Sequence, residues 1–130
     1  GAEKEALGIL VFDVTSAPSS FISEHEELLA KFLGITAAAN DKWNASQSDA
    51  MLKLIARESG MDLAGARSTI STMKFPSAKE QLSKAWLGGN AQTFMKGVAE
   101  VFVEAGSIDS ALPSYANSVN SAPLAAGTGM

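Results

Sequence analysis

The chain has 130 residues, of which 46% are hydrophobic and 18% charged, and its formal net charge is −4. This length suits one domain, and this composition suits a packed globular core. The ten basic residues are scattered along the chain, which argues against binding to nucleic acid or to an anionic membrane.

The first predicted element is a buried strand at residues 9–14, with the sequence ILVFDV. Its apolar, β-branched and aromatic residues favour a strand, and residues 15–22 can continue it. Pro18 has no backbone N–H to donate, so this continuation belongs at a sheet edge. A strand needs hydrogen-bonding partners, and the sequence predicts barely two strands. We therefore expect the partner strands in a second copy or in polypeptide outside this sequence.

A long helix is predicted at residues 24–43. Ser23 and Glu26 have the spacing of a capping box, and apolar residues then recur at helical intervals. A second capping box, Ser46 with Asp49, is predicted to start the next helix, which carries its own short apolar face. Gly60 has the position of a glycine that ends a helix.

Three further helices follow in the sequence. Asp62 caps a short helix, and a capping box at Ser77 opens a helix that runs through Trp86. The last clear helix covers residues 91–105 and ends at Gly106. Its predicted buried face carries Phe94, Val98 and Phe102, and its charged face carries Lys96, Glu100 and Glu104.

The sequence offers little material for catalysis, and we expect no enzyme. The single histidine, His25, lies among glutamates at a helix start and has no nucleophile beside it. The absence of cysteine excludes thiolate zinc sites and disulfides, and no glycine-rich phosphate loop is present. We expect no metal and no cofactor. No apolar run reaches the ~18 residues of a membrane span, and an export signal, if the protein has one, was removed or lies outside this sequence.

Asp13 is the one candidate site residue. It stands directly behind four strongly apolar residues, and burying a bare carboxylate is costly unless it has a partner. Either strand alternation points Asp13 to solvent, or the carboxylate lies in a cleft and binds a cationic group through a charge-assisted hydrogen bond. The large aromatic residues lie on helical stripes and are predicted to be core: Trp43, Trp86, Phe94 and Phe102.

Several segments resemble one family when they are taken in order. "FDVTSAPSSFISEHEEL" is similar to the Phe-Asp-Val segment of substrate-binding proteins of ABC importers for taurine and related sulfonates. "LIARESGMDLAGARSTIS", "FPSAKEQLSKAWLGG" and "VAEVFVEAGSIDSALPSYANSV" resemble later helices of that family. The resemblance covers residues 8–119 and corresponds to the carboxy-terminal part of these longer proteins.

The resemblance implies an α/β fold, namely the carboxy-terminal portion of a two-lobe, type II periplasmic-binding-protein fold that is mostly helical here with one or two strands. Residues 1–22 would be the hinge-crossing and first-lobe strands. Residues 23–119 would be a helical part that packs on the first lobe, and residues 120–130 a flexible tail.

The resemblance also implies a function. The protein would be a periplasmic transport component that binds taurine or a related sulfonate, with Asp13 at the ligand's amino group. Its partners would be the ABC transporter permease and an amino-terminal part of the same protein, and it would bind no nucleic acid. Two alternatives stay open: a small, mainly helical interaction or dimerisation domain, and a relative of the same fold that serves thiamine-precursor metabolism.

Overall fold

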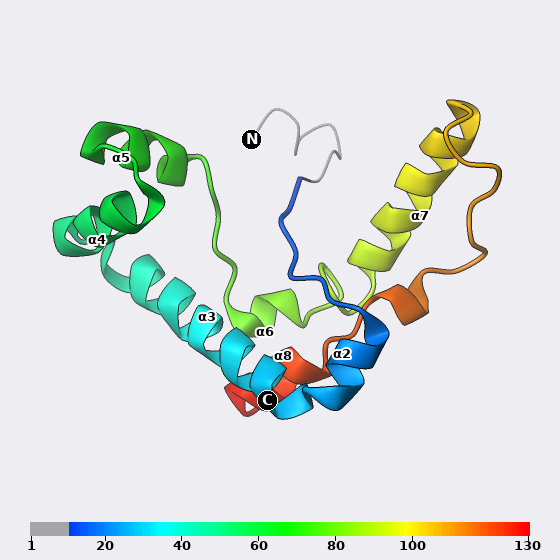
Figure 1. Ribbon diagram of the computed structural model, residues 1–130, viewed down its shortest axis with the longest axis horizontal. Coiled ribbons are helices and arrows are strands. Elements are labelled where there is room, and N and C mark those ends of the chain that lie inside the picture. Colours follow the sequence, from blue (N-terminus) through cyan, green and yellow to red (C-terminus); the bar gives the residue numbers. More distant parts are fainter. Residues whose placement is uncertain (1–10) are drawn as a thin grey trace.

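The computed structural model describes residues 11–130, and every regular element in this range is helical. The elements are α2 (Ser19–Glu24), α3 (Glu26–Ser46), α4 (Asp49–Ser59), α5 (Leu63–Ser71), α6 (Ala78–Gln81), α7 (Asn90–Glu104), the 3-10 turn η1 (Ala116–Ser118) and α8 (Ala122–Thr128). In Figure 1, α3 rises from the base of the molecule to an arm made of α4 and α5, while α7 forms a second arm.

The predicted α/β fold is therefore wrong for the part of the chain that the structure describes. Two residues of the predicted strand, Ile9 and Leu10, lie outside the described residues, and residues 11–18 are irregular rather than extended in a sheet. The predicted continuation to residue 22 ends instead in α2. The physical reason is that a strand forms only beside a partner, and residues 11–130 supply none.

Local capping explains where three of the helices begin. Ser48 and Ser77 accept hydrogen bonds from the backbone N–H groups of Met51 and Glu80, both at 3.3 Å. Asp62 Oδ1 accepts one from the Gly65 N–H at 2.6 Å. Each bond satisfies an N–H group that the first helical turn leaves without a partner. The predicted caps Asp62 and Ser77 are confirmed, whereas α4 is capped by Ser48 and not by the predicted Ser46, which is the last residue of α3.

The predicted start of the long helix is wrong. Ser23 lies inside α2, where its hydroxyl donates to the carbonyl oxygen of Ser20 at 2.9 Å instead of capping α3. The helical conformation is interrupted at His25, whose backbone N–H donates to the Phe21 carbonyl oxygen. Helix α3 then begins at Glu26. The predicted helix at residues 24–43 thus corresponds to α3, which begins two residues later, and the separate helix α2 precedes it.

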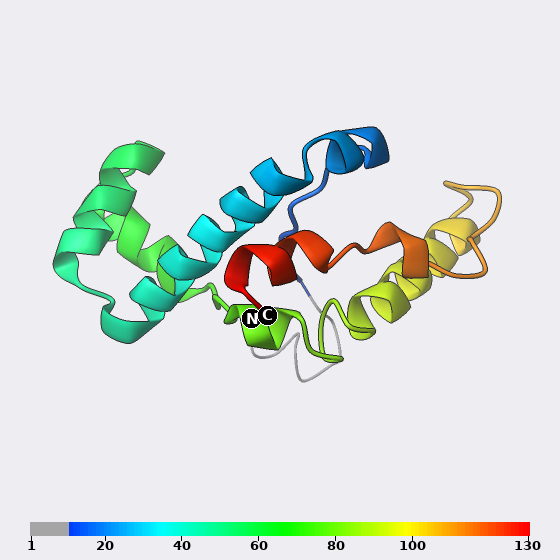
Figure 2. The same ribbon diagram turned by 90° about the horizontal axis from the view of Figure 1, so that it is seen from below.

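Small residues bring α3 and α8 into close contact. Gly34 and Gly127 face each other, and a Cβ atom on Gly127 would collide with the carbonyl oxygen of Ala30. Beside this contact, Leu124 of α8 packs with Ala37 and other residues of α3 and α6 in one of two buried clusters. Figure 2 shows the two helices side by side. The predicted flexible tail at residues 120–130 is therefore a helix that packs against α3, apart from its ends.

The second buried cluster lies between α4 and α5. Leu52, which is 1% exposed, packs with Ala56 and Ala66, and Trp43 and Ile70 cover the group. Gly60 joins the two helices with a positive φ of 70°, a conformation that favours glycine, as predicted for the end of α4.

Helix α6 ends at Gln81, so the predicted helix through Trp86 is too long, and residues 82–89 form turns instead. Helix α7 matches the predicted range 91–105 within one residue at each end. Its predicted charged face is exposed. Its predicted buried face is not fully buried, because Val98 is 36% exposed and Phe102 is 49% exposed.

The molecule exposes far more surface than a compact monomer of its size. The solvent-accessible area is 9279 Å² for 13.5 kDa, whereas a compact globular monomer of that mass exposes about 6,500 Å². Helix α7 packs extensively on no other helix within the described range. Of the helices in residues 11–130, none combines the length and the apolar character that a membrane crossing requires. Because the helices pack so loosely on one another, large apolar side chains remain exposed to solvent.

Candidate functional site

Three aromatic rings anchor the irregular segment that precedes α2. The Phe12 ring lies edge-on to the Trp86 ring, with ring centroids 5.8 Å apart and an interplanar angle of 83°. Its centroid lies 5.3 Å from that of Phe94, at 57°. Aromatic pairs in such tilted geometries contribute about 0.5–1.5 kcal/mol beyond the area that they bury. We call these three residues the aromatic cluster.

The turn between α6 and α7 holds Trp86 in place. The Trp86 backbone N–H donates to the Ser83 carbonyl oxygen at 3.1 Å, and the Trp86 carbonyl oxygen accepts from the Ala91 N–H at 3.0 Å. Gly88 is needed in this turn, because a Cβ atom there would lie 2.8 Å from the Ser83 oxygen. Trp86 from this turn and Phe94 from the first turns of α7 thereby contact the same Phe12 ring.

Asp13 follows the anchored Phe12 and is exposed. Among residues 11–130 no side chain forms an ion pair or hydrogen bond with its carboxylate. The segment that carries it runs between the two arms of the molecule (Figure 1). Exposure of Asp13 is compatible with both alternatives from the sequence, so its role in ligand binding stays a prediction. Its carboxylate is free to accept hydrogen bonds from a cationic group.

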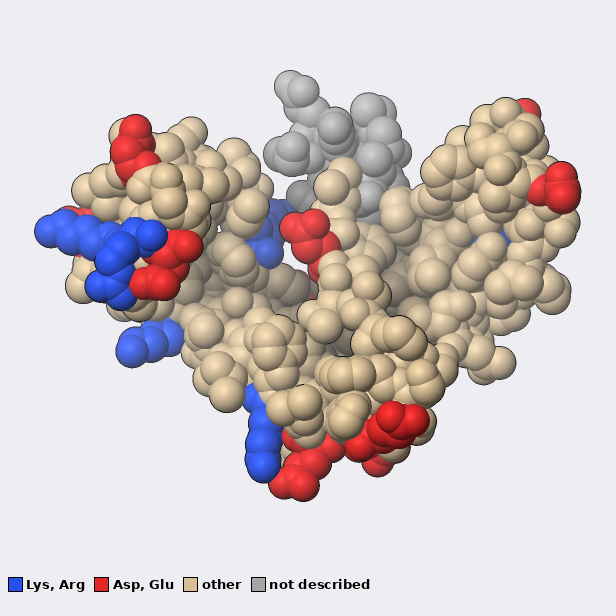
Figure 3. Space-filling model, in the orientation of Figure 1, with Lys and Arg blue, Asp and Glu red and all other residues tan. Residues whose placement is uncertain are grey.

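The charges of the molecule are unevenly distributed over its surface. On the face shown in Figure 3, the α4–α5 arm carries Lys and Arg together with Asp and Glu, the base is mostly acidic, and the α7 arm is largely uncharged. The exposed Asp13 carboxylate suits an ammonium group, which gains from charge pairing. A negatively charged group would need cationic partners that this segment does not supply.

Gln92 is a partly buried polar residue close in sequence to Phe94 of the aromatic cluster. Its Nε2 donates to the Leu87 carbonyl oxygen at 2.7 Å, and its buried Oε1 has no hydrogen-bond partner among the described residues. The sequence analysis missed this residue. Helical spacing could have indicated that Gln92 faces the inside of the molecule, because it precedes Met95 by three positions and the buried Ala99 by seven.

The other polar groups among residues 11–130 form no comparable candidate binding site. The His25 ring packs on the Phe21 ring, with ring centroids 4.5 Å apart, in an exposed position. No group of His, Asp and Glu residues within 11–130 could hold a metal ion. A shallow hollow of about 380 Å³ lies between α3, α6 and α8, with Asp41 and Lys79 at its edge.

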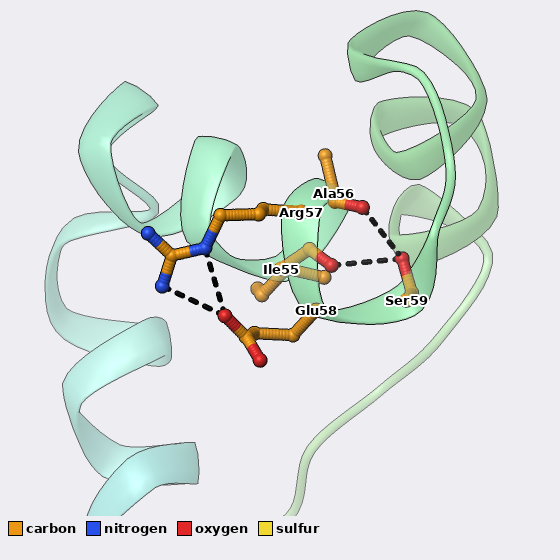
Figure 4. A network of polar contacts seen from close by, with 5 residues as sticks. All are labelled: Ile55, Ala56, Arg57, Glu58 and Ser59. Atoms are coloured by element: carbon orange, nitrogen blue, oxygen red, sulfur yellow. Dashed lines mark hydrogen bonds and ion pairs between the residues drawn. The ribbon is translucent and has the colours of Figure 1, made fainter.

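The polar network at the end of α4 is a surface feature of that helix. Arg57 pairs with its neighbour Glu58 at 2.7 Å, and the Ser59 hydroxyl donates to the carbonyl oxygens of Ile55 and Ala56 (Figure 4). Both members of the ion pair are mostly exposed, so the pair contributes little stability. These groups satisfy one another and the helix end rather than a ligand.

Comparisons with family models, with curated proteins and with solved structures find no match for this chain.

Proposed function

We propose that this chain is the carboxy-terminal part of the solute-binding component of an ABC importer. The component binds taurine or a related small sulfonate in the periplasm and delivers it to the permease. One observation carries the proposal: Asp13 is exposed and unpaired among the described residues, on a segment held by the aromatic cluster. The same segment has the sequence that resembles the taurine-binding family. The proposal concerns the role of the chain, which is itself helical.

The role of Asp13 follows from the chemistry of the ligand. Taurine carries an ammonium group and a sulfonate, and the Asp13 carboxylate accepts a hydrogen bond from the ammonium group. Phe12 fixes the backbone next to Asp13, so the carboxylate does not have to be ordered anew when the ligand arrives. The amino-terminal part of the protein supplies the donors for the sulfonate. Ligand binding then favours the conformation that docks on the permease.

A second candidate function has an observation in its favour. Apolar side chains are exposed on both α3 and α7, as in a helical interaction or dimerisation domain. The oligomeric state of this 130-residue chain separates the two functions. A stable dimer that buries both faces favours the second function, and a monomer that binds apolar dyes favours the first.

Replacement of Asp13 by Asn tests the proposed function in the complete polypeptide, meaning the product of the full reading frame that contains this chain. A charge-assisted hydrogen bond contributes about 1.5–3 kcal/mol, so Asp13→Asn should weaken taurine binding roughly 10–150-fold in calorimetric titration. The exposed Asp109→Asn is the matched control, because it removes the same charge from the connector after α7. Equal taurine affinity of the two variants would show that Asp13 does not bind the ligand.

A further inference from the structure

Residues 11–18 form the irregular segment that precedes α2, which we call the strap. Within the described range, no hydrogen bond joins residues 11–17 to any other residue. Val11 and Val14 are 79% and 63% exposed, and Asp13 is exposed as well. A segment with so few backbone hydrogen bonds and buried side chains opens at a low cost in free energy.

Phe12 supplies the main attachment of the strap. Its side chain is half-buried, and its ring centroid lies 5.8 Å from that of Trp86 and 5.3 Å from that of Phe94. Trp86 belongs to the turn before α7, and Phe94 belongs to α7 itself. The ring contacts thus link the strap to the base of the α7 arm, which packs extensively on no other helix in residues 11–130.

Pro18 fixes the other end of the strap. Its ring restricts φ, which is −58° here, and its carbonyl oxygen accepts the first hydrogen bond of α2, from the Ile22 N–H at 3.1 Å. Movement of the strap therefore stops at Pro18, where the helix begins.

Helix α8 shows what a permanent attachment requires in the same molecule. A Cβ atom on Gly127 would collide with the backbone of α3, and Leu124 is only 4% exposed. By contrast, no strap residue is fully buried, and none belongs to either buried cluster. The strap can therefore leave its position without opening the core.

We propose that the strap is a displaceable latch with Phe12 as its holding residue. In the seated state, which is the one described above, the Phe12 ring lies against Trp86 and Phe94. In the released state the strap turns about Pro18, the two rings are uncovered, and Asp13 moves away from the base of α7. A molecule that binds only one of these states shifts the equilibrium towards it. The latch goes beyond the proposed function, because it does not depend on which ligand Asp13 binds.

Limited proteolysis of the 130-residue chain with chymotrypsin tests the latch without any ligand. The protease cleaves after Phe12 only when this ring has left its contacts and entered the binding pocket of the protease. Mass spectrometry measures the initial rate at which the fragment that begins at Asp13 appears. A free peptide with the sequence of residues 8–18 gives the rate for an unattached segment. When opening is fast compared with cleavage, the ratio of the two rates reports the population of the released state.

Cleavage after Phe12 should be slower in the chain than in the peptide. Phe94→Leu should accelerate it about 2–10-fold, because leucine keeps the apolar bulk but loses the pair of rings. Leu52→Ala is the control, since it weakens the α4–α5 cluster, which contains no strap residue, and it should leave this rate unchanged.

Three results would overturn the latch. Equal rates in the chain and the peptide, or an unchanged rate in Phe94→Leu, would show that the rings do not hold Phe12. Acceleration by Leu52→Ala as large as that by Phe94→Leu would show that the strap is released only when the whole chain unfolds.

Discussion

Leu52→Ala is expected to lower the free energy of unfolding by about 2–5 kcal/mol, the range for leucine truncation in a packed core. Leu52 is 1% exposed and contacts residues of both α4 and α5. Its removal leaves a cavity in the buried cluster between α4 and α5. Urea unfolding of the 130-residue chain, followed by far-ultraviolet circular dichroism, measures the loss.

Phe102→Ala is the matched control for this prediction. The Phe102 side chain is 49% exposed, so its truncation in the 130-residue chain should cost less than about 1 kcal/mol, well below the about 3–5 kcal/mol of a fully buried phenylalanine. A Phe102 loss as large as that of Leu52 would mean that α7 is covered in solution. A small loss for Leu52 would mean that the α4–α5 cluster is not a packed core.

Gly127→Ala should separate α8 from α3. A Cβ atom at this position collides with the carbonyl oxygen of Ala30, which belongs to the backbone of α3 and cannot turn aside. Forcing extra volume into a packed contact costs about 1–3 kcal/mol, and loss of α8 would also expose Leu124. We expect a lower urea midpoint and faster hydrogen exchange of the α8 amides.

Gly97→Ala provides the opposite control within the same chain. Gly97 lies in the middle of α7, and nothing lies within 4 Å of a Cβ atom placed there. Alanine in a helix interior is more favourable than glycine by about 0.5–1 kcal/mol, so this variant should be slightly more stable. If both glycine variants changed the stability equally, the close contact of α3 and α8 would not exist in solution.

Most local features of the fold could be predicted from the sequence, although the cap of α4 is Ser48 and not the predicted Ser46. Ser48, Asp62 and Ser77 cap helices because their side chains reach an N–H group three residues ahead, an interaction within one turn. Gly60 ends α4 for an equally local reason, since it takes a positive φ. Such features depend on neighbouring residues and therefore leave a readable pattern.

The features that depend on distant contacts were predicted wrongly. The run at residues 9–14 has strand composition, but a strand also requires a partner, and residues 11–130 provide none. Residues 120–130 show no amphipathic pattern because α8 packs through a glycine and a leucine rather than through an apolar stripe. The predicted burial of Phe102 assumed a neighbour for α7 that the described chain lacks.

The candidate site was predicted in part. Asp13 could be selected because a carboxylate behind an apolar run is unusual, and the structure leaves it exposed. The contact of Phe12 with Trp86 and Phe94 could not be predicted, because these rings come from segments far apart in the sequence. Trp86 and Phe94 were expected to serve the core of their own helices, whereas they hold the segment that carries Asp13.

Calorimetric titration of taurine into the complete polypeptide tests the proposed function most directly. We expect saturable binding of one taurine per polypeptide, and strong competition from other small amino-sulfonates that present the same ammonium group to Asp13. An aliphatic sulfonate without an amino group should bind more weakly, by about the 10–150-fold that loss of the Asp13 hydrogen bond predicts. Absence of any heat of binding with taurine at millimolar concentration would contradict the assignment of this chain to a sulfonate-binding importer component.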